Sequence, residues 1–144
     1  MYEEWRVLHI DENEEESAAF CRALEENQFA GKCDTLRSIA EGKAWLEESL
    51  YMPHLRPRPD IVVLNWHLER DDEVFDFVRW LRAQPQFRET PLATWVGMET
   101  PASVRERARS AGITELVNKQ ETFEDLVEQT EELLQRCVSH CLAR

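Results

Sequence analysis

The chain contains few of the residues that interrupt regular structure. Its 144 residues include 4 glycines and 6 prolines, and no low-complexity run or internal repeat breaks up its evenly spread apolar segments. A flexible linker between two domains would need such a stretch. We therefore expect a single domain over residues 1–144, long enough to bury roughly two thirds of its unfolded surface without metals or disulfides.

The sequence also lacks long apolar runs and an excess of positive charge. No run approaches the ~20 apolar residues of a membrane span, and no apolar segment follows a basic start, so we expect a cytoplasmic protein. The 29 acidic residues outnumber the 17 lysines and arginines, which gives a formal net charge of -12. This charge repels nucleic acid and anionic membranes, so the expected partner is a basic or neutral protein.

Cysteines are few as well, and they do not suggest a disulfide framework. All 4 cysteines fall inside predicted helices or a strand, which is typical of a reducing compartment. Cys137, His140 and Cys141 lie within one turn of the last predicted helix. Two thiolates and one imidazole are too few for a closed zinc site unless Cys21 joins them, so we expect apolar packing, with zinc as the alternative.

The apolar segments that are present alternate between strand and helix patterns. Residues 61–64, IVVL, follow Pro59 as a continuous apolar run, which is typical of a strand buried on both faces. Weaker strand patterns cover residues 6–10, 29–36, 92–96 and 115–118, and amphipathic helix patterns separate them. Five such alternations predict a doubly wound parallel α/β sandwich with right-handed crossovers.

Polar residues mark where four of the helices should begin. The predicted N-caps are Asn13, Ser38, Thr100 and Thr122. Ser38 and Thr122 each have an acidic residue three positions later, as in a capping pair. Pro101 is expected as the first residue of its helix, where its missing N–H donor costs nothing. The last helix is expected to run to about residue 142.

Polar side chains also follow three of the predicted strands directly. Asp11 and Glu12 come after the first strand, Asn65 after the third and Lys119 after the fifth. Because the carboxyl ends of parallel strands meet at one edge of the sheet, we expect these four side chains to gather there. Carboxylate, amide and ammonium groups at such an edge indicate a candidate site.

Taken in order, several segments resemble the receiver domains of bacterial two-component response regulators. These segments are residues 7–12 (VLHIDE), 59–65 (PDIVVLN), 87–91 (FRETP), 111–112 (AG) and 117–119 (VNK). The resemblance covers nearly the whole chain and implies a flavodoxin-like three-layer sandwich with strand order 2-1-3-4-5. In that family an acidic pair binds Mg²⁺, an aspartate accepts a phosphoryl group, a serine or threonine contacts it, and a lysine neutralises its charge.

Carried over by position, the resemblance places Asp11 and Glu12 as the acidic pair and Lys119 as the lysine. Asn65 then stands at the phosphoacceptor position, and the backbone carbonyl of His67 would help to hold the metal. An amide nitrogen cannot attack a phosphodonor, because its lone pair is delocalised. Losing one carboxylate also weakens the site, so we expect weakly bound Mg²⁺ or no cofactor. Asn65 could instead simply satisfy Lys119 and nearby backbone groups.

The resemblance also implies that the switch residues have changed. Val96 stands at the hydroxyl position, and Leu116 stands at a position that is often aromatic. A bulge in the fourth strand would bring Thr94 forward instead, and this register is the alternative.

These departures predict a receiver-like signalling protein of a two-component phosphorelay that is not an enzyme and acts by binding proteins. The expected partners are a histidine kinase or an output protein. The alternative is a receiver that is phosphorylated on another acidic side chain: Glu69, Asp71 or Asp72. A flavodoxin-like cofactor binder is a remote alternative, because the acidic stretch at residues 11–16 would repel a phosphate group.

Charge also predicts an interaction face on the helix after residue 101, the fifth strand and the last helix. The residues that we assign to it are Arg105, Arg107, Arg109, Leu116, Glu124, Asp125, Glu128, Glu131 and Glu132. A two-fold axis would set the basic helix of one copy against the acidic helix of another, which makes this face a candidate homodimer interface. Solvated surface charge is the alternative, because exposed ion pairs contribute only about 0–1 kcal/mol each.

Overall fold

The computed structural model describes residues 5–29, 31–65, 72–119 and 121–142. Five parallel strands form one sheet in the order β2-β1-β3-β4-β5, which confirms the predicted architecture. The strands are β1 (Arg6–Asp11), β2 (Lys32–Leu36), β3 (Ile61–Asn65), β4 (Leu92–Val96) and β5 (Glu115–Asn118). The second strand is shorter than the predicted 29–36, because the amide of Phe29 bonds back to the carbonyl of Leu24 and Gln28 turns the chain at φ 58°.

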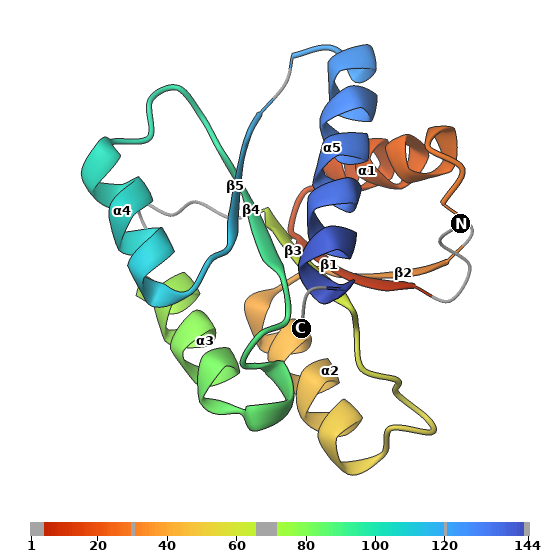
Figure 1. Ribbon diagram of the computed structural model, residues 1–144, viewed down its shortest axis with the longest axis vertical. Helices are drawn as coiled ribbons and strands as arrows, with labels where there is room; N and C mark the ends of the chain where they lie inside the picture. The colour runs from red at the N-terminus through yellow and green to blue at the C-terminus, as the bar shows by residue number, and fades with distance from the viewer. Residues whose placement is uncertain (1–4, 30, 66–71, 120, 143–144) are drawn as a thin grey trace.

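The helices cover both faces of this sheet, as Figure 1 shows. They are α1 (Glu14–Glu26), α2 (Ile39–Tyr51), α3 (Asp72–Ala83), α4 (Ala102–Ala111) and α5 (Phe123–Leu142), with a short 3-10 helix η1 (Pro85–Phe87). Helices α1 and α5 pack together on one face, and α2, α3 and α4 follow one another on the other. No helix within the described ranges is both long and apolar enough to span a bilayer.

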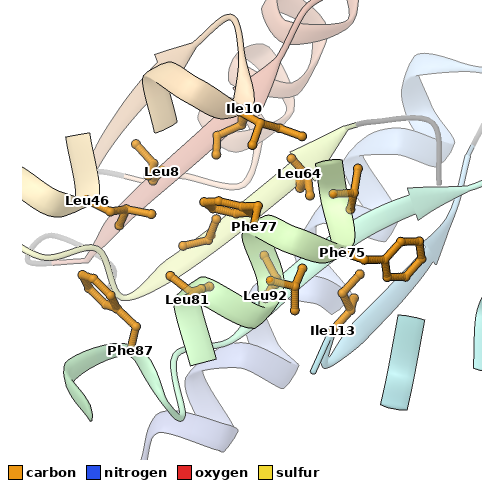
Figure 2. Packing of buried hydrophobic residues seen from close by; sticks show 14 of the residues in the cluster. Leu8, Ile10, Leu46, Leu64, Phe75, Phe77, Leu81, Phe87, Leu92 and Ile113 are labelled. Atoms are coloured by element: carbon orange, nitrogen blue, oxygen red, sulfur yellow. The ribbon is translucent and has the colours of Figure 1, made fainter. Parts of the chain in front are cut away.

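Alternating side chains of the strands form two apolar cores. Leu8 and Ile10 of β1 face α2 and α3, whereas Val7 on the same strand packs with residues of α1 and α5. Figure 2 shows the first core, in which Leu64 of β3 lies among aromatic and leucine side chains of α3. Gly42 allows α2 to approach Ile10 closely, because a Cβ atom there would overlap the Ile10 side chain. This packing fixes the position of β1 and β3 at the centre of the sheet.

Three of the four predicted helix caps are confirmed. The side chains of Asn13, Ser38 and Thr122 accept from the backbone N–H three residues later, at 3.0, 3.1 and 3.2 Å. The prediction for α4 was wrong, because α4 begins at Ala102 and Pro101 is its N-cap. Thr100 Oγ1 is already engaged, since it accepts from the Gly97 N–H at 3.1 Å within the β4–α4 loop.

The registers of the central strands align the polar strand ends. Asp11 pairs with Asn65 across β1 and β3, and Val96 pairs with Asn118 across β4 and β5. The Lys119 N–H then donates to the Val96 carbonyl at 2.8 Å. The carboxyl ends of β1, β3 and β5 therefore lie at one edge of the sheet, as the sequence predicted.

Candidate functional site

Asp11 and Asn65 form the buried centre of the candidate site. Asp11 ends β1 and is 1% exposed, and Asn65 ends β3 and is 8% exposed. The Asn65 side-chain nitrogen donates to Asp11 Oδ2 at 3.1 Å and also to Glu16 Oε2. Both partners are carboxylates, which only accept hydrogen bonds, so the amide must present its nitrogen to them. Asn65 therefore bridges two acidic side chains that would otherwise repel each other.

Glu16 is the site residue that we did not predict from the sequence. The sequence shows it only as one of the acidic residues in the first turn of α1. In a capping box this glutamate would turn back to the N–H of the cap residue. Here the Asn13 N–H donates to Asp11 Oδ1 at 2.9 Å instead, so the Glu16 side chain extends to Asn65. The sequence signal was the acidic residue at the third helical position, but only the tertiary contact shows its role.

Lys119 reaches the centre of the site through Glu16. Its ammonium nitrogen lies 3.5 Å from Glu16 Oε1, and both side chains are about half exposed. We had expected Asn65 to bond directly to Lys119. In the structure, both side chains donate to Glu16 instead. The structure thus brings together three of the predicted residues, Asp11, Asn65 and Lys119. Glu12, the second of the predicted acidic pair, is exposed in the β1–α1 loop.

Burial shifts the protonation of two groups at the end of β1. It raises the pKa of the Asp11 carboxyl above its ordinary value, an effect that hydrogen bonds from Asn13 and Asn65 oppose. Burial, together with the nearby positive charge of Arg37, lowers the pKa of His9 to about 4. His9 is fully buried, and neither ring nitrogen makes a hydrogen bond to a described residue; Nε2 lies 3.6 Å from Asp11 Oδ2. The imidazole is therefore neutral at pH 7.

A cleft of about 280 Å³ opens beside this polar centre, between α1 and α5. Its polar end consists of Asp11, Glu16, Asn65 and Lys119. Phe20, Trp95, Phe123 and Leu126 line its apolar end. Arg22 lies over the Phe123 ring, 4.5 Å from its centroid. This volume is just below the roughly 300–1,000 Å³ of most small-molecule sites.

The residues present do not fit a resident Mg²⁺ ion as they are placed. Mg²⁺ requires oxygen ligands in near-octahedral geometry, whereas the Asn65 N–H₂ group lies between the two carboxylates. The Lys119 ammonium adds a positive charge beside Glu16. His67, whose carbonyl was expected as a further ligand, lies outside the described residues, as do Glu69 and Asp71. The four cysteines carry free thiols, and the described residues form no cluster of three or more potential metal ligands.

The register of β4 places Val96, and not Thr94, at the strand end. Thr94 is buried and donates its hydroxyl to the Leu64 carbonyl at 2.8 Å. Val96 is buried in the core on the α2–α4 side of the sheet. Leu116 is half-buried and packs against the same core. The alternative register, with Thr94 brought forward by a bulge, is therefore wrong.

The basic row predicted on α4 is largely engaged within the chain. Arg105 donates to the Gly97 and Thr100 carbonyls at 2.7 and 3.2 Å, so it holds the β4–α4 loop. Arg107 pairs with Asp72 at 3.0 Å and lies 3.8 Å from the centroid of the Phe75 ring. Arg109 lies 3.8 Å from Glu106 on its own helix. By contrast, the carboxylates assigned to this face on α5 are exposed: Glu124, Asp125, Glu128, Glu131 and Glu132.

Neither the protein-family models nor the curated protein sequences contain a match to this chain. Solved structures, however, match its fold over most of its length. A response regulator in red light signaling of R. palustris has a TM-score of 0.78 at 17% identity and covers 91% of this chain and 92% of its own. The phosphorylated cyanobacterial phytochrome response regulator RcpA has a TM-score of 0.78 at 14% identity, with coverages of 94% and 95%.

A third match is the Mn²⁺-bound form of the response regulator Rcp1. Its TM-score is 0.73 at 15% identity, and it covers 90% of this chain and 91% of its own. These identities are too low to carry residue roles from one protein to another, but the superpositions extend over nearly the whole of both chains. The chain therefore has the flavodoxin-like α/β fold, with strand order 2-1-3-4-5, of response-regulator receiver structures.

Proposed function

We propose that this chain is a receiver-like signalling protein of a two-component system that forms no aspartyl phosphate and acts by binding proteins. The observation that carries the proposal is the position and bonding of Asn65. It ends the central strand β3, opposite Asp11, and its N–H₂ group donates hydrogen bonds to the carboxylates of Asp11 and Glu16. An amide in this place offers no nucleophilic oxygen to a phosphodonor. The protein would communicate by docking to a histidine kinase or an output protein.

The fold supports a role in two-component signalling, and the candidate site supports the loss of aspartyl phosphorylation. The similar solved structures are described as response regulators, one of them phosphorylated and one bound to Mn²⁺. In this chain the phosphoacceptor position carries the amide N–H₂ group of Asn65, which donates to Glu16. The Lys119 ammonium forms an ion pair with the same glutamate. We therefore propose that Mg²⁺ binds weakly or not at all.

The competing function is a receiver that is phosphorylated on another acidic side chain. Of the three candidates, Asp72 is described: it is exposed at the first position of α3 and pairs with Arg107 at 3.0 Å. It lies outside the cluster formed by Asp11, Glu16, Asn65 and Lys119. The flavin alternative finds less support, because the cleft is small and acidic groups line its polar end.

One experiment separates docking from phosphoryl transfer. The protein is incubated with acetyl phosphate and Mg²⁺, and its intact mass is followed over hours. We expect no gain of a phosphoryl mass. A mass gain that maps to Glu69, Asp71 or Asp72, and that is lost in the corresponding asparagine or glutamine variant, would establish the competing function. An ordinary receiver domain of matched size, treated in the same way, shows that the donor is active.

We further propose a homodimer through α4, β5 and α5, although few of the basic side chains of α4 are free to contact a second copy. Arg105 and Arg107 already serve contacts within the chain, so the basic contribution from α4 falls on Arg109. Its partners on the other copy would be exposed carboxylates of α5 such as Glu128 and Glu131.

A further inference from the structure

We propose that Glu16 is an internal anionic occupant of the site, whose carboxylate fills the space between Asn65 and Lys119 and excludes a phosphoryl group. This inference rests on the proposed function and deepens it. Loss of the acceptor aspartate would then be only one of two barriers to phosphorylation. The second is a side chain from α1 that already satisfies the groups with which a phosphoryl group would interact.

The backbone of the β1–α1 loop directs Glu16 into the site. Asp11 Oδ1 accepts the Asn13 N–H at 2.9 Å, and Asn13 Oδ1 accepts the Glu16 N–H at 3.0 Å. The first contact uses the donor that a glutamate at this position would otherwise cap. The second contact fixes the backbone of residue 16 against the end of β1. Glu16 is therefore held near Asn65 by the same loop that holds Asp11.

Two donors then converge on the Glu16 carboxylate, one on each oxygen. The Asn65 nitrogen donates to Oε2, and the Lys119 ammonium lies 3.5 Å from Oε1. A phosphoryl group attached at residue 65 would need a cation such as Lys119 to offset its charge. It would also have to lie beside the negative charge of Glu16, and like charges at this distance repel. Glu16 thus competes for Lys119 and at the same time disfavours another anion.

A purely structural role for Glu16 makes a different prediction. An acidic residue in the first turn of a helix is favoured by the helix dipole alone. Glu15 has this position too: it precedes Glu16 in the first turn of α1 and is exposed. Glu15→Gln therefore removes the same charge from the same turn and leaves the contacts of Glu16 with Asn65 and Lys119 in place.

The test restores the nucleophile and then removes each glutamate charge in turn. The variants are Asn65→Asp, Asn65→Asp with Glu16→Gln, and Asn65→Asp with Glu15→Gln, each incubated with acetyl phosphate and Mg²⁺. In the reaction, the introduced carboxylate forms a bond to phosphorus as the bond from phosphorus to the acetate oxygen breaks, and acetate leaves with the electron pair. Intact mass against time gives the rate of labelling.

We expect Asn65→Asp to be labelled slowly, and the variant that also carries Glu16→Gln to be labelled about tenfold faster or more, which corresponds to 1.4 kcal/mol. The variant with Glu15→Gln should match Asn65→Asp alone. Equal rates for all three variants, or no labelling of the variant with Glu16→Gln, would overturn the inference. Labelling of the wild-type chain would instead contradict the proposed function, so the two failures are distinguishable.

A second measurement does not depend on phosphorylation. In ¹H–¹⁵N spectra of otherwise unchanged protein, Glu16→Gln should shift the side-chain N–H₂ resonances of Asn65, because their acceptor has lost its charge. Glu15→Gln should leave these resonances in place. Equal shifts in both variants would show that Glu16 has no special contact with the site and would overturn the inference. The same spectra show that each variant is folded.

Discussion

At the scale of single residues, Asn65 decides the chemistry of the site. Its side chain differs from aspartate by one group, N–H₂ in place of an oxygen. That group removes a nucleophile and supplies a donor to Asp11 and Glu16. The donor has energetic as well as chemical consequences, because two carboxylates close together in a partly buried site need a compensating donor or cation.

This role predicts the effect of Asn65→Asp on stability. The variant places a third carboxylate beside Asp11 and Glu16, so in the presence of a chelator we expect the free energy of unfolding to fall by about 2–3 kcal/mol. Millimolar Mg²⁺ should recover most of this loss, because it binds the folded state. Urea unfolding with chelator and with Mg²⁺ measures both effects.

Asn118→Asp is the control for this prediction. Asn118 also ends a strand at the same edge of the sheet, but it is exposed. Its replacement should change the unfolding free energy by no more than about 0.5 kcal/mol and confer no response to Mg²⁺. If Asn65→Asp is as stable as wild type in chelator, Asn65 does not hold the acidic groups together.

His9 gives a pH-dependent prediction at the same scale. Its pKa is about 4 in the folded protein, whereas an unperturbed histidine has a pKa of 6.5, so on acidification the unfolded state binds a proton that the folded state does not. The free energy of unfolding is therefore unaffected by His9 above about pH 6.5, and it decreases as the pH falls from 6.5 towards 4. Between pH 7 and pH 5 the loss attributable to His9 is about 2 kcal/mol.

Urea unfolding at pH 7 and pH 5 tests the role of His9 by comparison with His9→Leu. The charged groups that face the ring are Asp11 and Arg37, and both remain in the variant. The difference between the two proteins in how the free energy of unfolding changes with pH therefore reports on the imidazole. We expect His9→Leu to lose less stability than wild type on acidification. His54→Gln, at an exposed position in the α2–β3 loop, is the control. Parallel pH dependence of wild type and His9→Leu would contradict the assignment.

At the scale of elements, the β4–α4 loop is held by several contacts at once. The Gly97 N–H donates to Thr100 Oγ1, the Thr100 N–H donates to the Gly97 carbonyl, and Arg105 donates to both carbonyls. In the sequence, Arg105 was assigned to a docking face. In the structure it is half-buried and couples the start of α4 to the end of β4, so the loop is expected to be rigid.

Arg105→Ala should release this loop. We expect a loss of about 1–2 kcal/mol in the free energy of unfolding, because hydrogen bonds from a charged group are removed. Amide exchange at residues 97–100 should become at least several-fold faster. Arg109→Ala is the matched control: Arg109 lies one turn later on α4 and, among the described residues, forms an exposed ion pair with Glu106. Its replacement should change stability by less than about 1 kcal/mol. Unchanged exchange in Arg105→Ala would mean that the loop is held by its own turn alone.

At the scale of the whole molecule, the charge distribution limits how two copies can meet. The net charge of -12 opposes self-association, so a dimer needs a local match of opposite charges. With two of the three arginines on α4 engaged internally, that match rests on Arg109 and the exposed carboxylates of α5.

Sedimentation tests the dimer directly. We expect a dimer at low ionic strength that dissociates as salt is added. Salt weakens the attraction between exposed charges, and the screening length falls to about 10 Å at 0.1 M salt. Arg109→Glu should abolish it. A monomer at every ionic strength, or a dimer that Arg109→Glu leaves intact, would end the proposal of this interface. Lys32→Glu, a charge reversal on an exposed residue of β2, serves as the control.

Prediction from sequence succeeded where the determining physics is local or periodic. The apolar run at 61–64 and the helix patterns on either side of it were sufficient for a parallel sheet covered on both faces, because a strand buried on both faces requires helices above and below it. The strand order 2-1-3-4-5 came from the resemblance to receiver domains, and the structure has that order. Strand ends also placed Asp11, Asn65 and Lys119 at one edge. The N-cap at Thr100 was mispredicted, because a threonine hydroxyl can serve a turn as well as a helix.

The order of residues along the chain was enough to place an amide at the end of the central strand, with the acidic and ammonium groups of β1 and β5 at the same edge. The groups that Asn65 contacts emerged only in the folded chain, since Glu16 is 49 residues from Asn65 and 103 from Lys119. Likewise, Arg105 was expected to be a surface charge, but in the folded chain it donates to two carbonyls of the β4–α4 loop. The physical reason is that a side chain's partner depends on competing donors and acceptors nearby in space, and periodicity in the sequence does not specify them.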